Sequence, residues 1–151
     1  MGLDSRKLGY VMALFGSKSS PQPPAPSEVK VDLVEEGFLR FLLSGESNGE
    51  LIKRAIDQMR VVVKGRRLRV FVLDAMAVTK VEMSMRAPGL EILALLKASG
   101  ATIGVVATTS SVVRLLATTL GVASGVRIEL QDTSELAMRR AHALAKGVKA
   151  G

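Results

Sequence analysis

The sequence contains no cysteine and no tryptophan, only one histidine, and few aromatic residues, which make up 3% of its 151 residues. Without cysteine the chain can form neither a disulfide framework nor a thiolate zinc site, and thiol nucleophiles are excluded. One histidine and scattered acidic residues give no pattern of metal ligands, so we expect neither a metal nor another cofactor. The scarcity of aromatic side chains removes the stacking surfaces on which single-stranded nucleic acids bind.

Long hydrophobic runs are also missing. Although 48% of the residues are hydrophobic, no apolar run approaches the roughly 18 to 20 residues that span a bilayer. We therefore expect a soluble protein, and the absence of cysteine fits a location in the cytoplasm. A chain of this length is in the range of a single domain with a substantial core.

Proline is concentrated near the N-terminus, in Ser17 to Ser27 (SKSSPQPPAPS), which has the composition of an extended linker. Ahead of it, two basic residues precede the apolar stretch Leu8 to Phe15, which is too short for a signal peptide and is followed by no small-residue cleavage site. We expect residues 1–28 to form an arm and linker, and residues 29–149 to form the folded domain. Contact between the arm and a membrane is a weaker alternative.

The folded part alternates between the periods of strands and helices. Residues 30–34 and 38–43 flank the turn Glu35-Glu36-Gly37 and predict an antiparallel hairpin. A helix should follow, from a capping box at Ser47 and Glu50 to Gly65, and then a buried strand over 70–73 and a loop over 75–81. The next elements expected are a helix over 85–100, a strand from Val105 that leads into a helix, and a strand over 126–130. The last helix should run from a capping box at Asp132 and Glu135 to Gly147.

This order predicts an α/β fold, ββαβαβαβα, with a mixed and mainly parallel sheet of about five strands packed with about four helices. The apolar residues that recur at helical spacing define the buried faces. They are Leu51, Ile52, Ala55, Met59 and Val62 in the first helix, and Leu90, Leu93, Leu95 and Leu96 in the second.

The stretch from Leu68 to Gly104 carries the strongest functional signal. An apolar strand ends at Asp74, and Ser84 stands just before a helix that stops at Gly100. This stretch resembles the STAS domain, the fold of bacterial anti-sigma factor antagonists and of the cytoplasmic tails of sulfate transporters. The antagonists carry Asp-Ser-Ser-Gly-Leu in the corresponding loop, and the alignment puts Glu82 in the place of the aspartate and Ser84 in the place of the phosphorylated serine.

The resemblance implies a non-enzymatic protein-interaction module of a bacterial regulatory system, such as an anti-sigma factor antagonist controlled by phosphorylation of Ser84. The implied partner is an anti-sigma factor, a serine kinase or a scaffold subunit. In this family the loop before the next helix lies beside the phosphoserine. The candidate partner-binding residues are therefore Glu82, Met83, Ser84, Met85, Arg86, Thr109, Ser110 and Ser111.

One departure from the family pattern bears on the switch. Met83-Ser84-Met85-Arg86 replaces Ser-Ser-Gly-Leu, so the small residues that give a kinase access to the serine are absent. Met83 and Met85 can form the rim of a docking surface, since methionine adapts to irregular partners, or belong to the core. Ser84 can also be a plain N-cap of the helix that follows it, as can Thr109 or Ser110 of the next helix.

These simpler interpretations lead to two alternative functions. One is an unphosphorylated scaffold or accessory subunit, as in stress-signalling complexes or lipid-transport ATPases. The other is a small ligand-binding α/β domain, because a fold does not fix a function. A homo-oligomer is compatible with each of them.

Catalytic chemistry has little support in the sequence. His142 lies among basic residues of the last helix, where we expect it to face solvent. Asp74 and Glu82 form the best carboxylate pair, but acceptance of hydrogen bonds from nearby N–H groups is their more ordinary role.

The formal net charge is +7, and two groups of basic residues contribute to it. They are Lys64, Arg66, Arg67 and Arg69 before the central strand, and Arg139, Arg140, Lys146 and Lys149 near the C-terminus. An acidic protein or an anionic surface is a reserve hypothesis for their partner, and nucleic acid is disfavoured.

Overall fold

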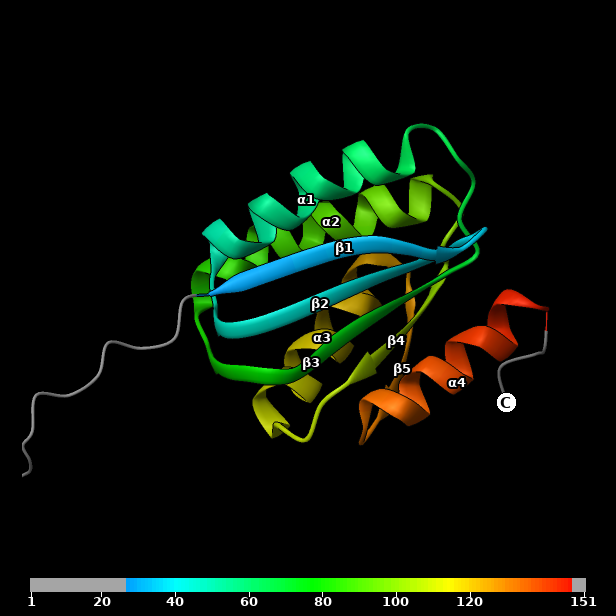
Figure 1. Ribbon diagram of the computed structural model, residues 1–151. Coiled ribbons are helices and arrows are strands. Elements are labelled where there is room, and N and C mark those ends of the chain that lie inside the picture. The colour runs from blue at the N-terminus through cyan, green and yellow to red at the C-terminus, as the bar shows by residue number, and fades with distance from the viewer. Residues whose placement is uncertain (1–26, 148–151) are drawn as a thin grey trace, which may run out of the picture.

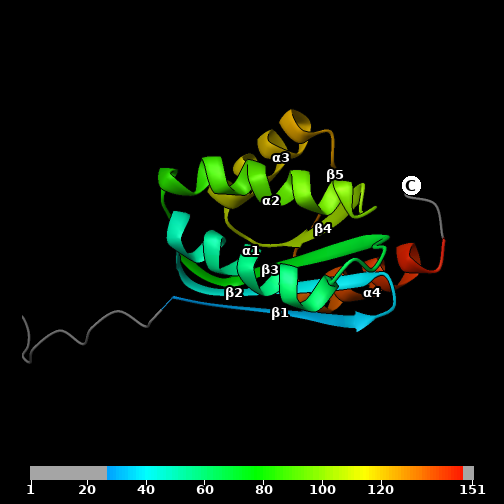
Figure 2. The same cartoon turned by 90° about the horizontal axis from the view of Figure 1, so that it is seen from above.

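The structure, a computed structural model, describes residues 27–147, which form a mixed sheet with helices on both faces (Figures 1 and 2). The strands lie side by side in chain order, and only the first pair is antiparallel. The strands are β1 (Glu28–Glu35), β2 (Phe38–Ser47), β3 (Val70–Val81), β4 (Ile103–Ala107) and β5 (Arg127–Gln131). Lys149 and nearly all of the expected arm, 1–28, lie outside the described residues.

Three helices cover one face of the sheet, and a fourth covers part of the other (Figure 2). α1 (Gly49–Val63), α2 (Arg86–Ala98) and α3 (Ser111–Ser124) share the first face, and α4 (Ser134–Ala145) lies on the second. The predicted order of strands and helices is therefore confirmed. Crossovers through α1, α2 and α3 join the successive parallel strands β2 to β5, as a parallel sheet requires.

The sheet separates two apolar cores. Phe41, Phe71 and Leu96 lie in the larger core under α1, α2 and α3, where the two phenylalanine rings meet edge to face at 6.3 Å. Phe38 and Val105 lie in the smaller core under α4. Residues 70–72 of β3 are buried because the strand is covered on both faces, as its continuous apolar run predicts.

The expected caps of two helices are wrong by one residue. Asn48, not Ser47, caps α1, and its side chain accepts a hydrogen bond from the N–H of Leu51 at 2.9 Å. Ser47 belongs to β2, where it is buried. Thr133, not Asp132, caps α4 by accepting a hydrogen bond from Leu136.

The loop predicted over 75–81 is also wrong, because β3 continues to Val81. The second half of the strand pairs with β2 through two register shifts. β4 ends at Ala107, opposite Asp74, so this half has a neighbour on one side only and is more exposed. Because this half is exposed, it contains a mixture of polar and apolar residues. It therefore lacks the continuous apolar run by which a buried strand is predicted from sequence.

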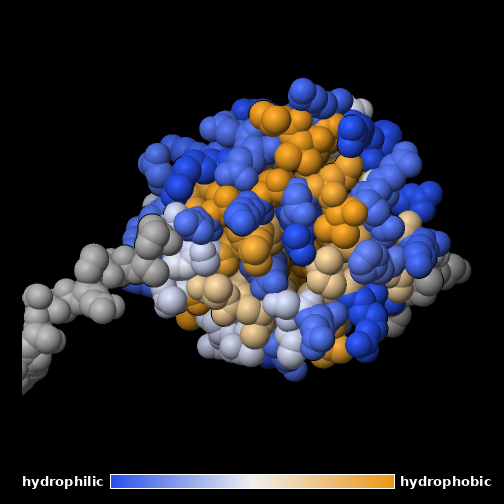
Figure 3. Space-filling model, viewed as in Figure 1, coloured by the Kyte–Doolittle hydropathy of each residue, from blue (hydrophilic) through white to orange (hydrophobic). Residues whose placement is uncertain are grey.

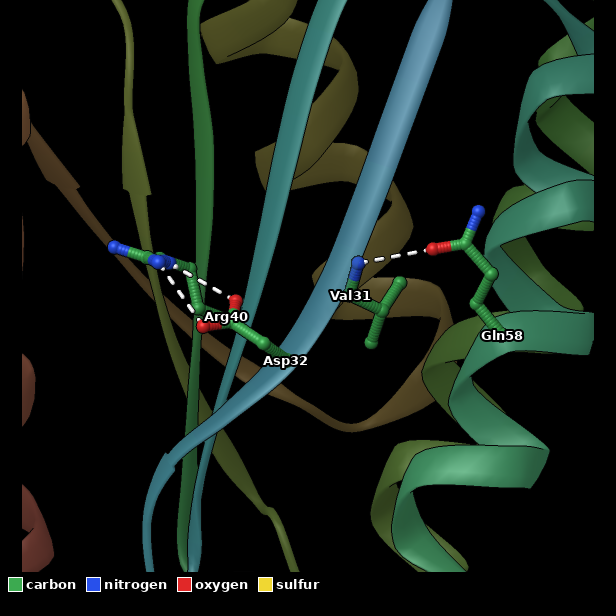
Figure 4. A network of polar contacts seen from close by, with 4 residues as sticks. All are labelled: Val31, Asp32, Arg40 and Gln58. Atoms are coloured by element: carbon green, nitrogen blue, oxygen red, sulfur yellow. Dashed lines mark hydrogen bonds and ion pairs between the residues drawn. The ribbon is translucent and has the colours of Figure 1, made fainter.

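The outer edge of β1 is covered by a side chain of α1 (Figure 4). The amide of Gln58 accepts a hydrogen bond from the N–H of Val31 and donates one to the carbonyl of Val29, both at 3.0 Å. On the opposite face of the hairpin, Arg40 forms a bidentate ion pair with Asp32, its cross-strand neighbour. Gln58 thus satisfies two backbone groups that an edge strand otherwise leaves open to another chain.

Apolar side chains also reach the surface. Figure 3 shows apolar residues gathered over α1 and the first two strands, interrupted by hydrophilic ones. Val61 of α1 and Leu42 of β2 are among the exposed hydrophobic residues. Within residues 27–147, no helix has the length and apolar character needed to cross a membrane.

Candidate functional site

The candidate serine lies on a short turn between β3 and α2. The turn is the 3₁₀ helix η2 (Met83–Met85), at the end of the sheet where α1 begins (Figure 1). Ser84 is exposed, and 73% of the Met83 surface is open to solvent. Met85 is half-buried and packs against the larger core. One of the two methionines is therefore a surface residue, and the other contributes to the core.

The turn is fixed to the junction between β2 and α1. The Ser84 hydroxyl accepts a hydrogen bond from the N–H of Gly49 at 3.1 Å, and Glu82 N–H donates to the carbonyl of Ser47 at 2.8 Å. The hydroxyl of Ser47 donates to the sulfur of Met85 at 3.3 Å. Ser84 therefore adds a second side-chain cap to α1, beside that of Asn48, and does not cap the helix that follows it.

The start of α2 explains why Ser84 is free for this role. No side chain caps α2, which begins directly from the 3₁₀ turn. Pro88, in its first turn, has no N–H that needs a partner, as expected from the sequence. The N–H of Gly49 is one of the unpaired donors at the start of α1, and the Ser84 hydroxyl satisfies it.

The surroundings of Ser84 are more acidic than the chain as a whole. A shallow depression around the hydroxyl is lined by residues 48–50, 53, 82, 84, 87, 88 and 91. It contains three carboxylates, Glu50, Glu82 and Glu91, and one cation, Lys53. The start of α1 also contributes the partial positive charge of a helix N-terminus. An anion placed on Ser84 would therefore be repelled by the three carboxylates and attracted by the start of α1.

The second candidate loop has a structural role. Ser110 caps α3 by accepting a hydrogen bond from Val113 N–H at 3.3 Å, and its own N–H donates to the hydroxyl of the buried Thr108. The predicted capping by Thr109 or Ser110 is thus confirmed for Ser110. Thr109 and Ser111 are exposed. None of residues 109–111 lines the depression around Ser84, so the expected meeting of the two loops does not take place there.

The carboxylates predicted as a pair are far apart. Asp74 and Glu82 are eight residues apart along β3 and its end, which separates them by about 25 Å at the rise of an extended strand. Asp74 accepts a hydrogen bond from Met76 N–H at 3.1 Å, the ordinary role expected for it. Among residues 27–147, no three histidine or acidic side chains gather in a way that would hold a metal ion.

His142 does not simply face solvent, as the sequence led us to expect. Its ring packs edge-on against Phe38, with ring centroids 4.9 Å apart, and its Nδ1 lies 2.8 Å from Glu35. The side chain is 43% exposed. His142 thus joins α4 to the end of the hairpin, far from Ser84 in the fold (Figure 1).

One residue of the first basic group, Arg69, contacts α4, the helix that carries Arg139 and Arg140 of the second group. Arg69 donates to the carbonyl of Ala145 at 2.6 Å, which also places a cation at the C-terminal end of α4. Arg140 instead faces β5, where it binds Glu129 through two nitrogens. These hydrogen bonds raise the pKa of the Arg140 guanidinium above its usual value.

Comparison with known proteins identifies the fold. No protein-family model matches the sequence, and no curated protein matches it. Among solved structures, an uncharacterized DUF3478-family protein from Shewanella loihica PV-4 with a SpoIIAA-like fold superimposes with a TM-score of 0.58 at 9% identity, covering 82% of this chain and 99% of that one. The chain has a STAS-like fold.

A second similar structure is the anti-sigma factor antagonist SpoIIAA in its unphosphorylated form. It has a TM-score of 0.56 and 15% identity, and the match covers 76% of this chain and 97% of that one. The STAS-like fold expected from the residues between Leu68 and Gly104 is thus confirmed. At such low identity the likeness concerns the arrangement of strands and helices. The roles of individual residues rest on the contacts within this chain.

Sequence reasoning missed the half of the site that α1 supplies. Asn48, Gly49, Glu50 and Lys53 surround Ser84, although they precede it by more than 30 residues. The only signal in the sequence around these four residues was the start of a helix. That signal does not predict that the Ser84 turn packs against the helix.

Proposed function

We propose that the protein is a non-enzymatic interaction module of a bacterial regulatory system that presents the Ser84 turn and the start of α2 to a protein partner in the cytoplasm. The observation that carries the proposal is the placement of Ser84. Its hydroxyl is exposed on a turn held rigidly against α1, and the exposed Met83 lies beside it. A rigid turn with an adaptable apolar side chain suits a docking surface.

The STAS-like fold supports an anti-sigma factor or a serine kinase as the partner, since one similar structure is an anti-sigma factor antagonist. Met83 is the best candidate for an apolar anchor, and Glu82 and Arg86 supply polar groups at its sides. Residues 109–111 belong to the same end of the sheet but form no part of the depression around Ser84. We therefore place them at the margin of the partner surface.

Phosphorylation of Ser84 is the proposed control. A phosphoryl group adds about −1.5 to −2 charge at pH 7. It would take the place of a hydroxyl that now accepts a hydrogen bond from Gly49, within a depression that already contains three carboxylates. Repulsion from these carboxylates favours displacement of the turn, although the start of α1 attracts the anion. The modification would thus change both the charge and the shape that a partner meets.

The experiment compares partner capture by four forms of the full chain in extracts of the native cell: wild type, Ser84→Ala, Ser84→Asp and the control Ser134→Asp. Ser134 is the first residue of α4, where an acidic side chain is well tolerated. We expect wild type, Ser84→Ala and Ser134→Asp to capture the same protein, and Ser84→Asp to lose it. Mass spectrometry of native material should find phosphate on Ser84.

Equal capture by all four forms, with no phosphate on Ser84, would contradict the switch. It would favour the second candidate, an unphosphorylated scaffold or accessory subunit. One contact favours that candidate: the Ser84 hydroxyl already has a structural role as a cap of α1. The methionines on both sides, in place of small residues, point the same way because they limit the access of a kinase.

A further inference from the structure

A cavity of about 80 Å³ lies between the sheet and helices α2 and α3. Among its lining residues, only Ser47 and Gly89 are not hydrophobic, and the Ser47 hydroxyl donates to the sulfur of Met85. A buried water needs only about 10 to 15 Å³ of such volume, but it also needs two to four polar partners. The wall offers almost no polar partners, so we expect the cavity to contain no water.

Small side chains leave the space open. Ala75 of β3 and Ala117 of α3 contribute to the wall where larger apolar residues would fill the volume. An unfilled apolar cavity lowers the stability of a folded domain, because its lining atoms lose packing partners. A void of this size in a single small domain is therefore a candidate binding site.

The position of the half-buried lining residues shows where the cavity approaches the surface. Phe71, Ile92 and Val106 on its inner side are fully buried. The half-buried lining residues are Leu73, Val78 and Val81 of β3, Met85, Leu116 and Ala117 of α3, and Ile128 of β5. The mouth of the cavity thus lies between the end of β3 and α3, and the flexible Met85 side chain lies at its border.

We propose that this cavity binds the end of an alkyl chain. An engineered apolar cavity of about 150 Å³ admits benzene. The cavity here is smaller and partly open, which favours a slender chain that enters by its apolar end and leaves its polar end in solvent. The wall contains no charged group, and its one side-chain hydroxyl, that of Ser47, already donates to Met85, which disfavours a polar ligand.

The cavity adjoins the Ser84 turn through Met85. This side chain lines the cavity and accepts a hydrogen bond from Ser47, and its backbone follows Ser84 directly. A chain that enters beside Met85 displaces its side chain and changes the bond between Ser84 and Gly49. This second part of the proposal rests on the proposed function of the turn, but occupation of the cavity does not.

The test uses methyl and amide NMR spectra of the full chain, with 1-hexanol as the alkyl probe and xenon as a probe of the void. We expect both to shift the methyl signals of Ile92, Val106 and Val113, which line the cavity, and to leave Leu144 of the smaller core unchanged. Ala117→Leu should fill the cavity and weaken the binding of 1-hexanol by at least about tenfold. Ala123→Leu, the same change at an exposed position of α3, should leave binding unchanged.

Thermal unfolding of each variant shows whether it folds, and Ala117→Val replaces Ala117→Leu if the larger side chain is not accommodated. The absence of shifts at the lining methyl groups, or equal binding by Ala117→Leu and Ala123→Leu, would overturn the alkyl site. Shifts at these methyl groups without any change at the Gly49 amide would overturn the coupling to Ser84. Neither result bears on partner capture by the Ser84 variants, which tests the proposed function separately.

Discussion

The hydroxyl of Ser84 accepts a hydrogen bond from the backbone N–H of Gly49, 35 residues earlier in the chain. The carbonyl of Ser84 lies over the same glycine, so closely that a Cβ on Gly49 would come within 2.7 Å of the oxygen. The turn and the start of α1 therefore form one unit. A substitution in the turn should therefore alter the start of α1, and a substitution at the start of α1 should alter the turn.

Gly49→Ala tests the close approach. An alanine in a helix is normally more favourable than glycine by about 0.5 to 1 kcal/mol. Here the new methyl group meets a backbone carbonyl, which cannot move as a flexible side chain can. We therefore expect the opposite sign, a loss of about 1 to 3 kcal/mol in the free energy of unfolding by urea. A gain in stability would show that the turn does not rest on Gly49.

Ser84→Ala tests the hydrogen bond itself. Loss of a capping side chain costs about 0.5 to 2 kcal/mol of stability, and amide hydrogen exchange at Gly49 should become faster. Ser84→Asp keeps an acceptor at this place and should retain more of the stability. Ser111→Ala, at an exposed serine that opens α3, is the control and should change little. Equal stability of all these variants would remove the capping role of Ser84.

Much of the fold follows from patterns that are local in the sequence. The helical spacing of Leu51, Ile52 and Ala55 correctly predicted the buried face of α1, and the alternation around Gly37 correctly predicted the hairpin. These patterns work because an amphipathic helix or a half-buried strand records its own environment in its residues. The second half of β3 was missed because it has a neighbouring strand on one side only and carries no continuous apolar run.

The site was less predictable because its contacts join distant parts of the chain. Capping rules assign a serine to the helix that follows it, whereas Ser84 caps a helix that precedes it by 35 residues. In the same way, Ser47 fits a capping box but bonds to Met85, 38 residues away. The resemblance to STAS domains pointed to the turn that carries Ser84. It gave no information on α1, which supplies most of the surroundings of Ser84.

Gln58→Ala tests the cover of the sheet edge. The substitution removes two hydrogen bonds to the backbone of β1, which should cost about 1 to 2 kcal/mol. It should also speed amide exchange at Val31 and increase self-association in light scattering, because an open edge strand pairs with other chains. Asp57→Ala, at an exposed neighbouring position on α1, is the control. If both variants behave alike, the side chain of Gln58 does not protect the edge.

Deletion of residues 1–26 tests the proposed boundary of the domain. Ser27 is retained because its hydroxyl accepts a hydrogen bond from Glu46 N–H at 3.1 Å. If the proline-rich segment is a linker, the thermal midpoint should stay nearly unchanged. A large drop would show that the apolar stretch Leu8 to Phe15 contributes to the core. The mass in solution should be measured alongside, since an arm exchanged between two copies would give the same drop.

Leu93→Ala tests the larger core and the cavity together. Leu93 is 8% exposed and lines the cavity, so its truncation should cost about 2 to 5 kcal/mol through lost burial and a larger void. Leu115→Ala, at a leucine of α3 that is 71% exposed, should change the free energy of unfolding by less than about 0.5 kcal/mol.

The enlarged cavity gives the Leu93 variant a second readout. A larger apolar void should admit benzene, and a ligand that binds only the folded state raises its stability. We therefore expect benzene to restore part of the lost thermal midpoint in Leu93→Ala and to have little effect on wild type or Leu115→Ala. A loss of stability in Leu93→Ala without any recovery in benzene would mean that the core had collapsed around the missing side chain and that the void was not held open by its walls.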